Sequence, residues 1–85
     1  MNTKGKLSVS KAIIEALKDT ERMNIENGAN NVFHKYFLFT AVRSKLGSMY
    51  RADDEMIGRT MRKLRAKCVI DYTHKHSGIY TFEIK

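Results

Sequence analysis

Five cationic side chains lie within nine residues of this chain, with no acidic residue among them. They are Arg59, Arg62, Lys63, Arg65 and Lys67. A guanidinium group pairs bidentately with guanine O6 and N7 in the major groove, and both arginine and lysine bind phosphate oxygens. The stretch therefore predicts contacts with DNA. The alternative is an ordinary solvated helix face, because basic residues near a helix C-terminus are favourable in any protein.

Hydroxyl, basic and imidazole side chains on both sides extend the predicted contacts with phosphate. The complete set of candidate DNA-binding residues is Arg43, Ser48, Arg51, Arg59, Arg62, Lys63, His74, Lys75 and His76. The acidic run Asp53, Asp54 and Glu55 comes immediately before the basic stretch. We expect these acids to serve the positive end of a helix dipole rather than to read bases.

Catalytic and metal-binding chemistry finds little support. His74 and His76 are predicted on the same side of an extended segment, but two ligands fall short of the three or four that zinc sites use. The glycines are isolated from one another, so the chain has no glycine-rich phosphate loop. The sequence predicts a protein that is not an enzyme and has no cofactor or metal site.

Composition limits the size of the fold and the type of partner. The chain has 85 residues, 42% of them hydrophobic, and a net charge of +7. These values predict one small domain and a polyanionic partner. The first seven residues are mostly polar and contain glycine, so we expect a frayed segment at 1–7 and the domain at 8–85. No apolar run approaches the ~18 residues of a membrane span, so we expect no membrane partner and a cytoplasmic location, associated with the nucleoid if bacterial. The single cysteine, Cys68, is predicted to be a buried, inert thiol on an apolar helix face.

Periodicity predicts the elements at both ends of the chain. A helix is expected at 9–22, capped by Ser8 or Ser10, and another after the cap Asp53, with Ile57, Met61, Leu64 and Cys68 on its buried face. Strands are expected at 69–73 and 79–84, around a turn at Ser77-Gly78.

The segment 32–47, VFHKYFLFTAVRSKLG, admits two interpretations. One continuous helix would be apolar almost all round. We favour a split: a short helical turn or strand through 36–39, then a helix capped by Thr40 and ending at Gly47. The four aromatic residues Phe33, Tyr36, Phe37 and Phe39 are predicted to fill the core rather than to form a platform for stacking bases.

The order of helix, helix, helix and hairpin resembles the winged helix-turn-helix superfamily of DNA-binding domains. FTAVRSKLG matches the first helix of the helix-turn-helix, ADDEMIGRTMRKLRAK the second, and CVIDYT the entry to the wing. The resemblance implies an α+β fold with three helices packed on a C-terminal β-hairpin wing, and a short third strand near 36–39 under the split interpretation. It also implies binding to double-stranded DNA by a small transcriptional regulator or an accessory factor in a DNA transaction. A phage or mobile-element origin would fit such a small protein.

Two features depart from that pattern. The connection 23–35 is long and rich in asparagine, and the proposed recognition helix begins with acids. The alternative function is therefore a protein-protein docking module that uses the recognition helix or wing and does not bind DNA itself. Both a monomer and a dimer remain open.

Overall fold

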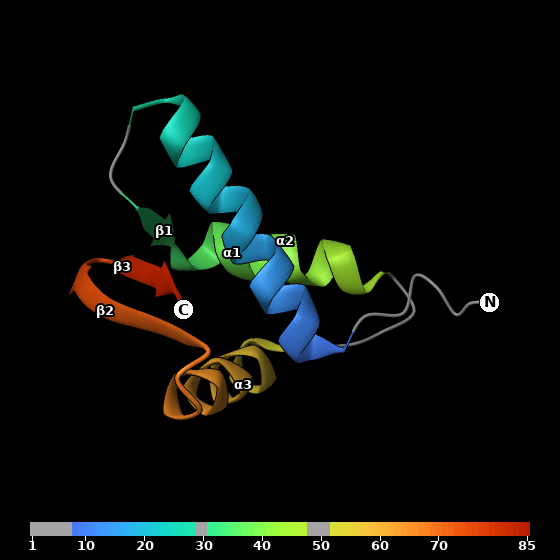
Figure 1. Ribbon diagram of the computed structural model, residues 1–85. Coiled ribbons are helices and arrows are strands. Elements are labelled where there is room, and N and C mark those ends of the chain that lie inside the picture. The colour runs from blue at the N-terminus through green and yellow to red at the C-terminus, as the bar shows by residue number, and fades with distance from the viewer. Residues whose placement is uncertain (1–7, 29–30, 48–51) are drawn as a thin grey trace.

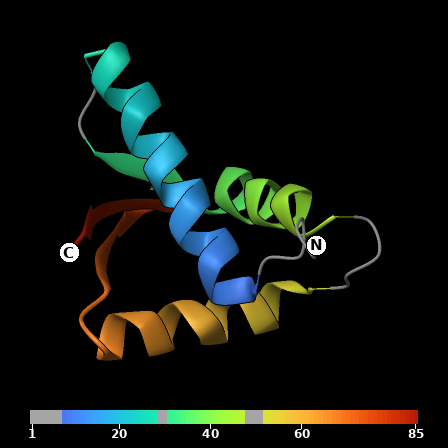
Figure 2. The same cartoon turned by 45° about the vertical axis from the view of Figure 1, so that its right-hand side comes forward.

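The chain forms three helices and a small antiparallel sheet, which confirms the α+β class (Figure 1). The computed structural model describes residues 8–28, 31–47 and 52–85. Its elements are α1 (Val9–Glu26), β1 (Val32–His34), α2 (Lys35–Leu46), α3 (Asp54–Ala66), β2 (Ile70–His76) and β3 (Ile79–Ile84). The strand order is β1-β3-β2, and α1 packs against both other helices (Figure 2). This order is compatible with a winged helix-turn-helix fold.

Helix α1 begins as predicted and ends later. The Lys11 backbone N–H donates to Ser8 Oγ at 3.1 Å, so Ser8 is the cap. The predicted end at 22 is wrong, because the helix continues to Glu26. The extra turn is held by a polar contact that hydrophobic periodicity does not reveal: the side-chain amide of Asn24 donates to the carbonyl of Val32 in β1 at 2.8 Å.

Segment 32–47 does divide into two elements as predicted, but the division lies at a different position. The third strand is β1 at 32–34, whereas 36–39 is helical, and α2 runs unbroken through Thr40. His34 caps this helix, its Nδ1 accepting from the Tyr36 N–H at 3.2 Å, and the helix ends before Gly47 as predicted.

Only half of the aromatic segment enters the core. Phe33 and Phe39 are buried, but Tyr36 is 64% exposed and Phe37 is 78% exposed. The prediction that all four aromatics fill the core is therefore wrong for these two. The reason is that α2 already buries the opposite side, which carries Leu38, Phe39, Val42 and Leu46.

Helix α3 has the predicted cap and buried face, but Cys68 was misplaced. The Met56 N–H donates to Asp53 Oδ1 at 2.8 Å, and Ile57, Met61 and Leu64 are buried. Cys68 is exposed and lies beyond the helix with φ +62°. Its N–H donates to Arg65 O and the Val69 N–H to Leu64 O, both at 3.0 Å. This pattern is a Schellman motif, whose left-handed position is normally occupied by glycine.

Replacing Cys68 with glycine is expected to stabilise the protein by up to about 1 kcal/mol, because the left-handed conformation costs an L-residue roughly 1–2 kcal/mol and glycine much less. Urea unfolding measures the change. Cys68→Ser is the control, since it removes the thiol and keeps the backbone cost; an equal gain in that variant would contradict the explanation.

The hairpin has the predicted turn and one irregularity. Ser77 and Gly78 form the two-residue connection, with φ +23° and +78°. Strand β2 extends to His76, beyond the predicted end at 73, and a bulge interrupts its pairing between His74 and His76. His74 pairs with Tyr80 and His76 with the adjacent Ile79, so the two imidazoles belong to opposite faces of the sheet. The expectation that they share a side is therefore wrong.

An ion-pair cluster joins α1 to α2. Asp19 Oδ2 lies 2.7 Å from Lys45 Nζ, and Asp19 Oδ1 lies 3.0 Å from Arg22 Nη2. The hydrogen bond from Lys45, with the nearby charges of Lys45 and Arg22, lowers the pKa of Asp19 despite the opposing effect of its partial burial.

Because the folded-state pKa of Asp19 is lowered, its contribution to stability is present above the ordinary aspartate pKa of about 4 and is lost as pH falls through the lowered value. Asp19→Asn is expected to cost less than about 1 kcal/mol at pH 7, as for other exposed pairs. Thermal unfolding of both proteins between pH 7 and pH 2 should show this difference shrinking below pH 4. A difference that persists unchanged in acid would contradict the assignment.

Candidate nucleic-acid interface

The solvent face of α3 carries the cations that the sequence singled out. Arg59, Arg62, Lys63, Arg65 and Lys67 are all exposed. Arg59 pairs with Glu55 at 3.2 Å within the helix, and Arg65 Nε lies 3.4 Å from Asp71 Oδ1. Within the part of the chain that the structure describes, Arg62 and Lys63 form no ion pair. Lys67, at the C-cap of α3, also has no ion pair among the described residues, so Arg62, Lys63 and Lys67 are the cations of this stretch most available to an external anion.

Arg43 has an intramolecular role at the junction of α2 and α3. Its Nε donates to the carbonyl of Ala52 at 3.0 Å, and its Nη2 pairs with Asp54 in the first turn of α3. The predicted phosphate contact of Arg43 would compete with these bonds. The arrangement indicates that Arg43 orients α3 relative to α2.

Arg43→Met is expected to destabilise the protein by about 1–2 kcal/mol, because it removes a charge-assisted hydrogen bond to a part-buried carbonyl. Urea unfolding measures the loss. The salt dependence of any DNA affinity should stay the same, since this arginine would release no counterion from a phosphate. A salt slope reduced by about one unit would instead assign Arg43 to a phosphate contact.

The other predicted residues divide between two places. Ser48 and Arg51 lie outside the described residues. His74, Lys75 and His76 lie at the far end of the hairpin, where Lys75 sits within the bulge and the His74 ring packs against Tyr80 with centroids 5.0 Å apart.

The hairpin turn is held against the junction of β1 and α2. The Lys35 N–H donates to the carbonyl of Gly78 at 2.8 Å. Strand β2 has seven residues, so the turn lies roughly 20 Å along the strand from the end of α3. Lys75 at the hairpin end and the cations of α3 therefore lie in two separate places.

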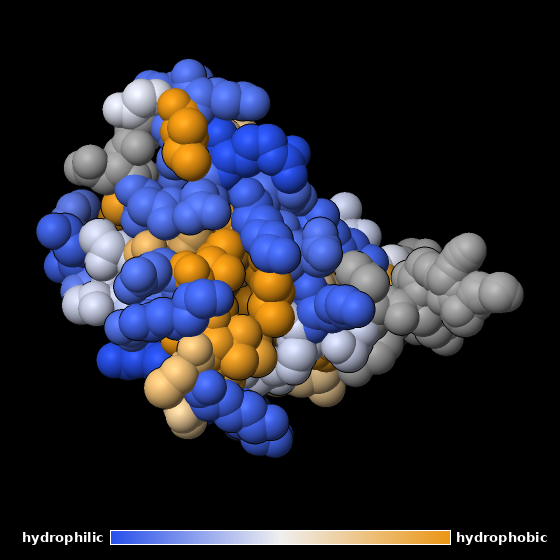
Figure 3. All heavy atoms as spheres, viewed as in Figure 1, coloured by the Kyte–Doolittle hydropathy of each residue, from blue (hydrophilic) through white to orange (hydrophobic). Residues whose placement is uncertain are grey.

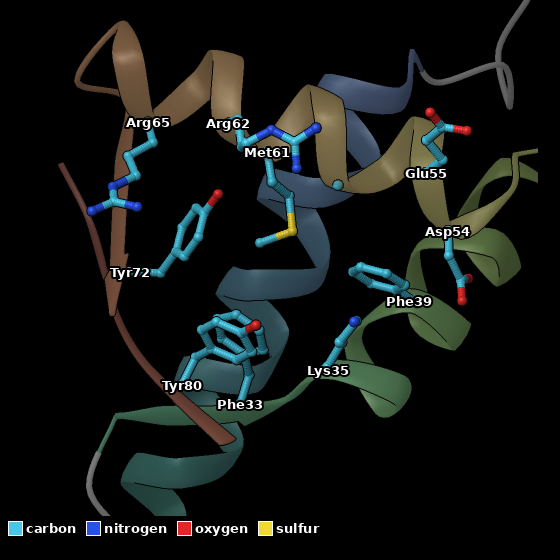
Figure 4. Close-up of a pocket in the computed structure, with 11 residues that line it drawn as sticks. Phe33, Lys35, Phe39, Asp54, Glu55, Met61, Arg62, Arg65, Tyr72 and Tyr80 are labelled. Atoms are coloured by element: carbon cyan, nitrogen blue, oxygen red, sulfur yellow. The ribbon is translucent and has the colours of Figure 1, made fainter. Parts of the chain in front are cut away.

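A cleft of about 450 Å³ separates α3 from the sheet (Figure 4). Arg62 and Arg65 reach it from α3 and Lys35 from the start of α2, while Phe33, Tyr72 and Tyr80 line it from the strands. Lys35, Tyr72 and Tyr80 were not predicted as candidate site residues. The available signal was the alternation of apolar or aromatic residues along the two strands, Ile70 and Tyr72 in β2 and Tyr80, Phe82 and Ile84 in β3. This alternation does not show that α3 leaves part of that face uncovered.

Apolar side chains are exposed in a different region. Met23 and Ile25 at the end of α1 are 60% and 72% exposed, and Phe37 projects from α2. Met23 and Phe37 also line a cavity of about 550 Å³ with Val32 and Ile79. On the face drawn in Figure 3, hydrophilic residues border a central strip of hydrophobic ones.

Comparisons with protein-family models, with curated proteins and with solved structures found no match to this chain. Its function must therefore be inferred from its own residues. Among the described residues, no helix is long and apolar enough to cross a membrane. The same residues contain no group of three or more His, Cys, Asp or Glu side chains that could hold a metal ion.

Proposed function

We propose that this chain binds double-stranded DNA as a winged helix-turn-helix protein, with α3 as the recognition helix and the β2–β3 hairpin as the wing. The observation that supports this proposal is the exposed pair Arg62 and Lys63, which has no internal ion pair among the described residues of a chain with net charge +7. A small transcriptional regulator or accessory factor in the cytoplasm is the role that such binding suggests.

In this proposal the middle of α3 meets the major groove. The groove is about 12 Å wide and admits a helix, and an arginine paired with guanine discriminates against other bases by about 1–3 kcal/mol. The acids of the first turn would interfere little, because each has a partner inside the protein: Asp53 caps the helix, Asp54 pairs with Arg43, and Glu55 pairs with Arg59. Lys75 at the hairpin end would contact phosphates elsewhere on the duplex.

Binding of random-sequence duplexes, measured by fluorescence anisotropy at several salt concentrations, tests the proposal. A protein that neutralises six to ten phosphates loses roughly 10³–10⁵ in affinity between 50 and 200 mM salt. Absence of binding to any duplex at low salt would refute the proposal. Selection of bound duplexes from a random pool then distinguishes sequence-specific from architectural binding.

The exposure of Phe37 favours a second candidate function, docking to another protein without DNA binding. Met23, Ile25 and Phe37 lie on α1 and α2, so this surface differs from the recognition helix and wing. If docking is the function, Phe37→Ser should abolish capture of such a partner, substitutions on the exposed face of α3 should leave that capture unchanged, and the wild-type protein should bind no duplex.

A further inference from the structure

We propose that the cleft between α3 and the sheet binds one unpaired nucleotide, recognised as a planar ring linked to a phosphate. The inference rests on the proposed function for the source of that nucleotide, a strand of bound DNA. The cleft volume of about 450 Å³ falls within the range of roughly 300–1,000 Å³ typical of small-ligand sites.

The charges around the cleft favour an anion. Asp54 and Glu55 lie at one end, and their carboxylates pair with Arg43 and Arg59. Of the three cations at the cleft, Arg65 is shared with Asp71, while Lys35 and Arg62 form no ion pair among the described residues. A phosphate between these two side chains would receive charge-assisted hydrogen bonds.

The aromatic residues supply a surface for a ring. Tyr80 stacks on Phe33 with centroids 5.1 Å apart and an interplanar angle of 5°, and Tyr72 meets Tyr80 edge to face at 6.0 Å. Figure 4 shows these rings on the sheet side of the cleft, opposite Met61. Nucleobases stack on such side chains whatever their sequence, because every base has a π-face. The aromatic rings of the strands, together with the cations Lys35 and Arg62, therefore suit a nucleotide better than an inorganic anion.

Gly58 keeps the helix side of the cleft open. Gly58 lies in the interior of α3 and places no side chain beside the helix at this point. Among the described residues, apart from its chain neighbours and the backbone of its own helix, the only heavy atom within 4 Å of an added Cβ would be Arg62 Nη1 at 3.8 Å, so alanine fits at this position. Since Gly58 lines the cleft, a larger side chain there would occupy the space that a ring needs.

The position of Arg62 connects this site to the duplex. Arg62 belongs to the exposed face of α3 and also lines the cleft. A nucleotide that leaves the stack beside α3 would therefore enter the cleft without separating from the bound strand. Extrusion costs least for a base that is already unpaired, so the site should favour bulges and strand ends.

The test compares the affinity for a fully paired duplex with that for the same duplex carrying one unpaired nucleotide, both by fluorescence anisotropy. The wild-type protein should bind the bulged duplex about 5- to 100-fold more tightly, as expected for stacking of one base. Gly58→Leu should reduce this ratio to about one, whereas Gly58→Ala, the matched control, should retain it. Lys35→Gln, outside α3, should lower the ratio as well, and thermal unfolding verifies that each variant folds.

A wild-type ratio near one, or an unchanged ratio in Gly58→Leu, would overturn the inference and leave the proposed function standing. A second experiment distinguishes failure of the nucleotide site from failure of the proposed DNA binding. Free dAMP and inorganic phosphate are each titrated into the protein, and the NMR ring resonances of Tyr72 and Tyr80 are followed. If no duplex binds but dAMP shifts these resonances in the wild-type protein and not in Gly58→Leu, the cleft is a site for a free nucleotide and the proposed function fails. If inorganic phosphate binds as tightly as dAMP, or dAMP causes no shift, the nucleotide site is refuted.

Discussion

Reversing the charge of Arg62 and Lys63 together, by R62E and K63E, is expected to lower duplex affinity roughly 30-fold to several hundred-fold. Each lost contact is worth about 1–3 kcal/mol where it reads a base, and each lost phosphate contact reduces the salt slope by about one unit. Both side chains are exposed, so the folded state should be little affected, within about 1 kcal/mol including the helix-dipole contribution of Lys63. Fluorescence anisotropy across a salt series measures both the affinity and the slope.

Reversal of two exposed lysines on α1, Lys11→Glu with Lys18→Glu, is the matched control because it changes the net charge by the same amount. This control should weaken binding only a few-fold, because it lowers the overall positive electrostatic potential of the protein. An equal loss in the two double variants would show that net charge, rather than the face of α3, accounts for binding. Unaltered affinity in R62E/K63E would show that the duplex does not contact this face of α3.

Ile57→Ala is expected to destabilise the protein by about 2–5 kcal/mol, the usual cost of removing a fully buried branched side chain. Ile57 is 0% exposed and belongs to the cluster that joins α3 to α1 and α2. An 85-residue domain has about 4–13 kcal/mol of total stability, so one such change removes a large part of it. Urea unfolding at constant m-value measures the loss.

Met56→Ala tests whether burial is the cause. Met56 precedes Ile57 on the same helix and is 37% exposed, so its truncation should cost well under half as much. Ile57→Val should fall between the two, at about 0.5–1.5 kcal/mol. Equal costs at positions 56 and 57 would mean that α3 is not anchored through the buried face described above.

These two predictions concern opposite faces of one helix. The buried face, with Ile57, Met61 and Leu64, packs α3 onto the core. The ion pair between Arg43 and Asp54 holds the first turn of α3 against α2. The exposed face then presents Arg62 and Lys63 in a defined orientation. The proposed DNA binding would therefore depend on interactions that do not themselves touch DNA.

The features that depend on neighbouring residues could be predicted from the sequence. Helix α3 was predicted from its cap Asp53 and from its apolar period, and the hairpin turn was predicted from Ser77-Gly78. Caps, turns and amphipathic periods are interactions over at most a few residues, so they can be read directly along the chain.

The features that depend on distant residues became visible only in the folded protein. Strand β1 lies at 32–34 because Phe33 pairs with Tyr80 near the other end of the chain. Helix α2 therefore begins at Lys35, directly after this strand, and not at the predicted cap Thr40. Cys68 follows the apolar period of α3 but lies in a Schellman turn, where the exit of the chain toward β2 sets the backbone. The cleft exists because Lys35, Arg62 and Tyr72 come from three elements that meet only in the folded protein. Helical periods and caps are local and therefore visible in the sequence, whereas strand pairing and concave surfaces require the long-range contacts that folding creates.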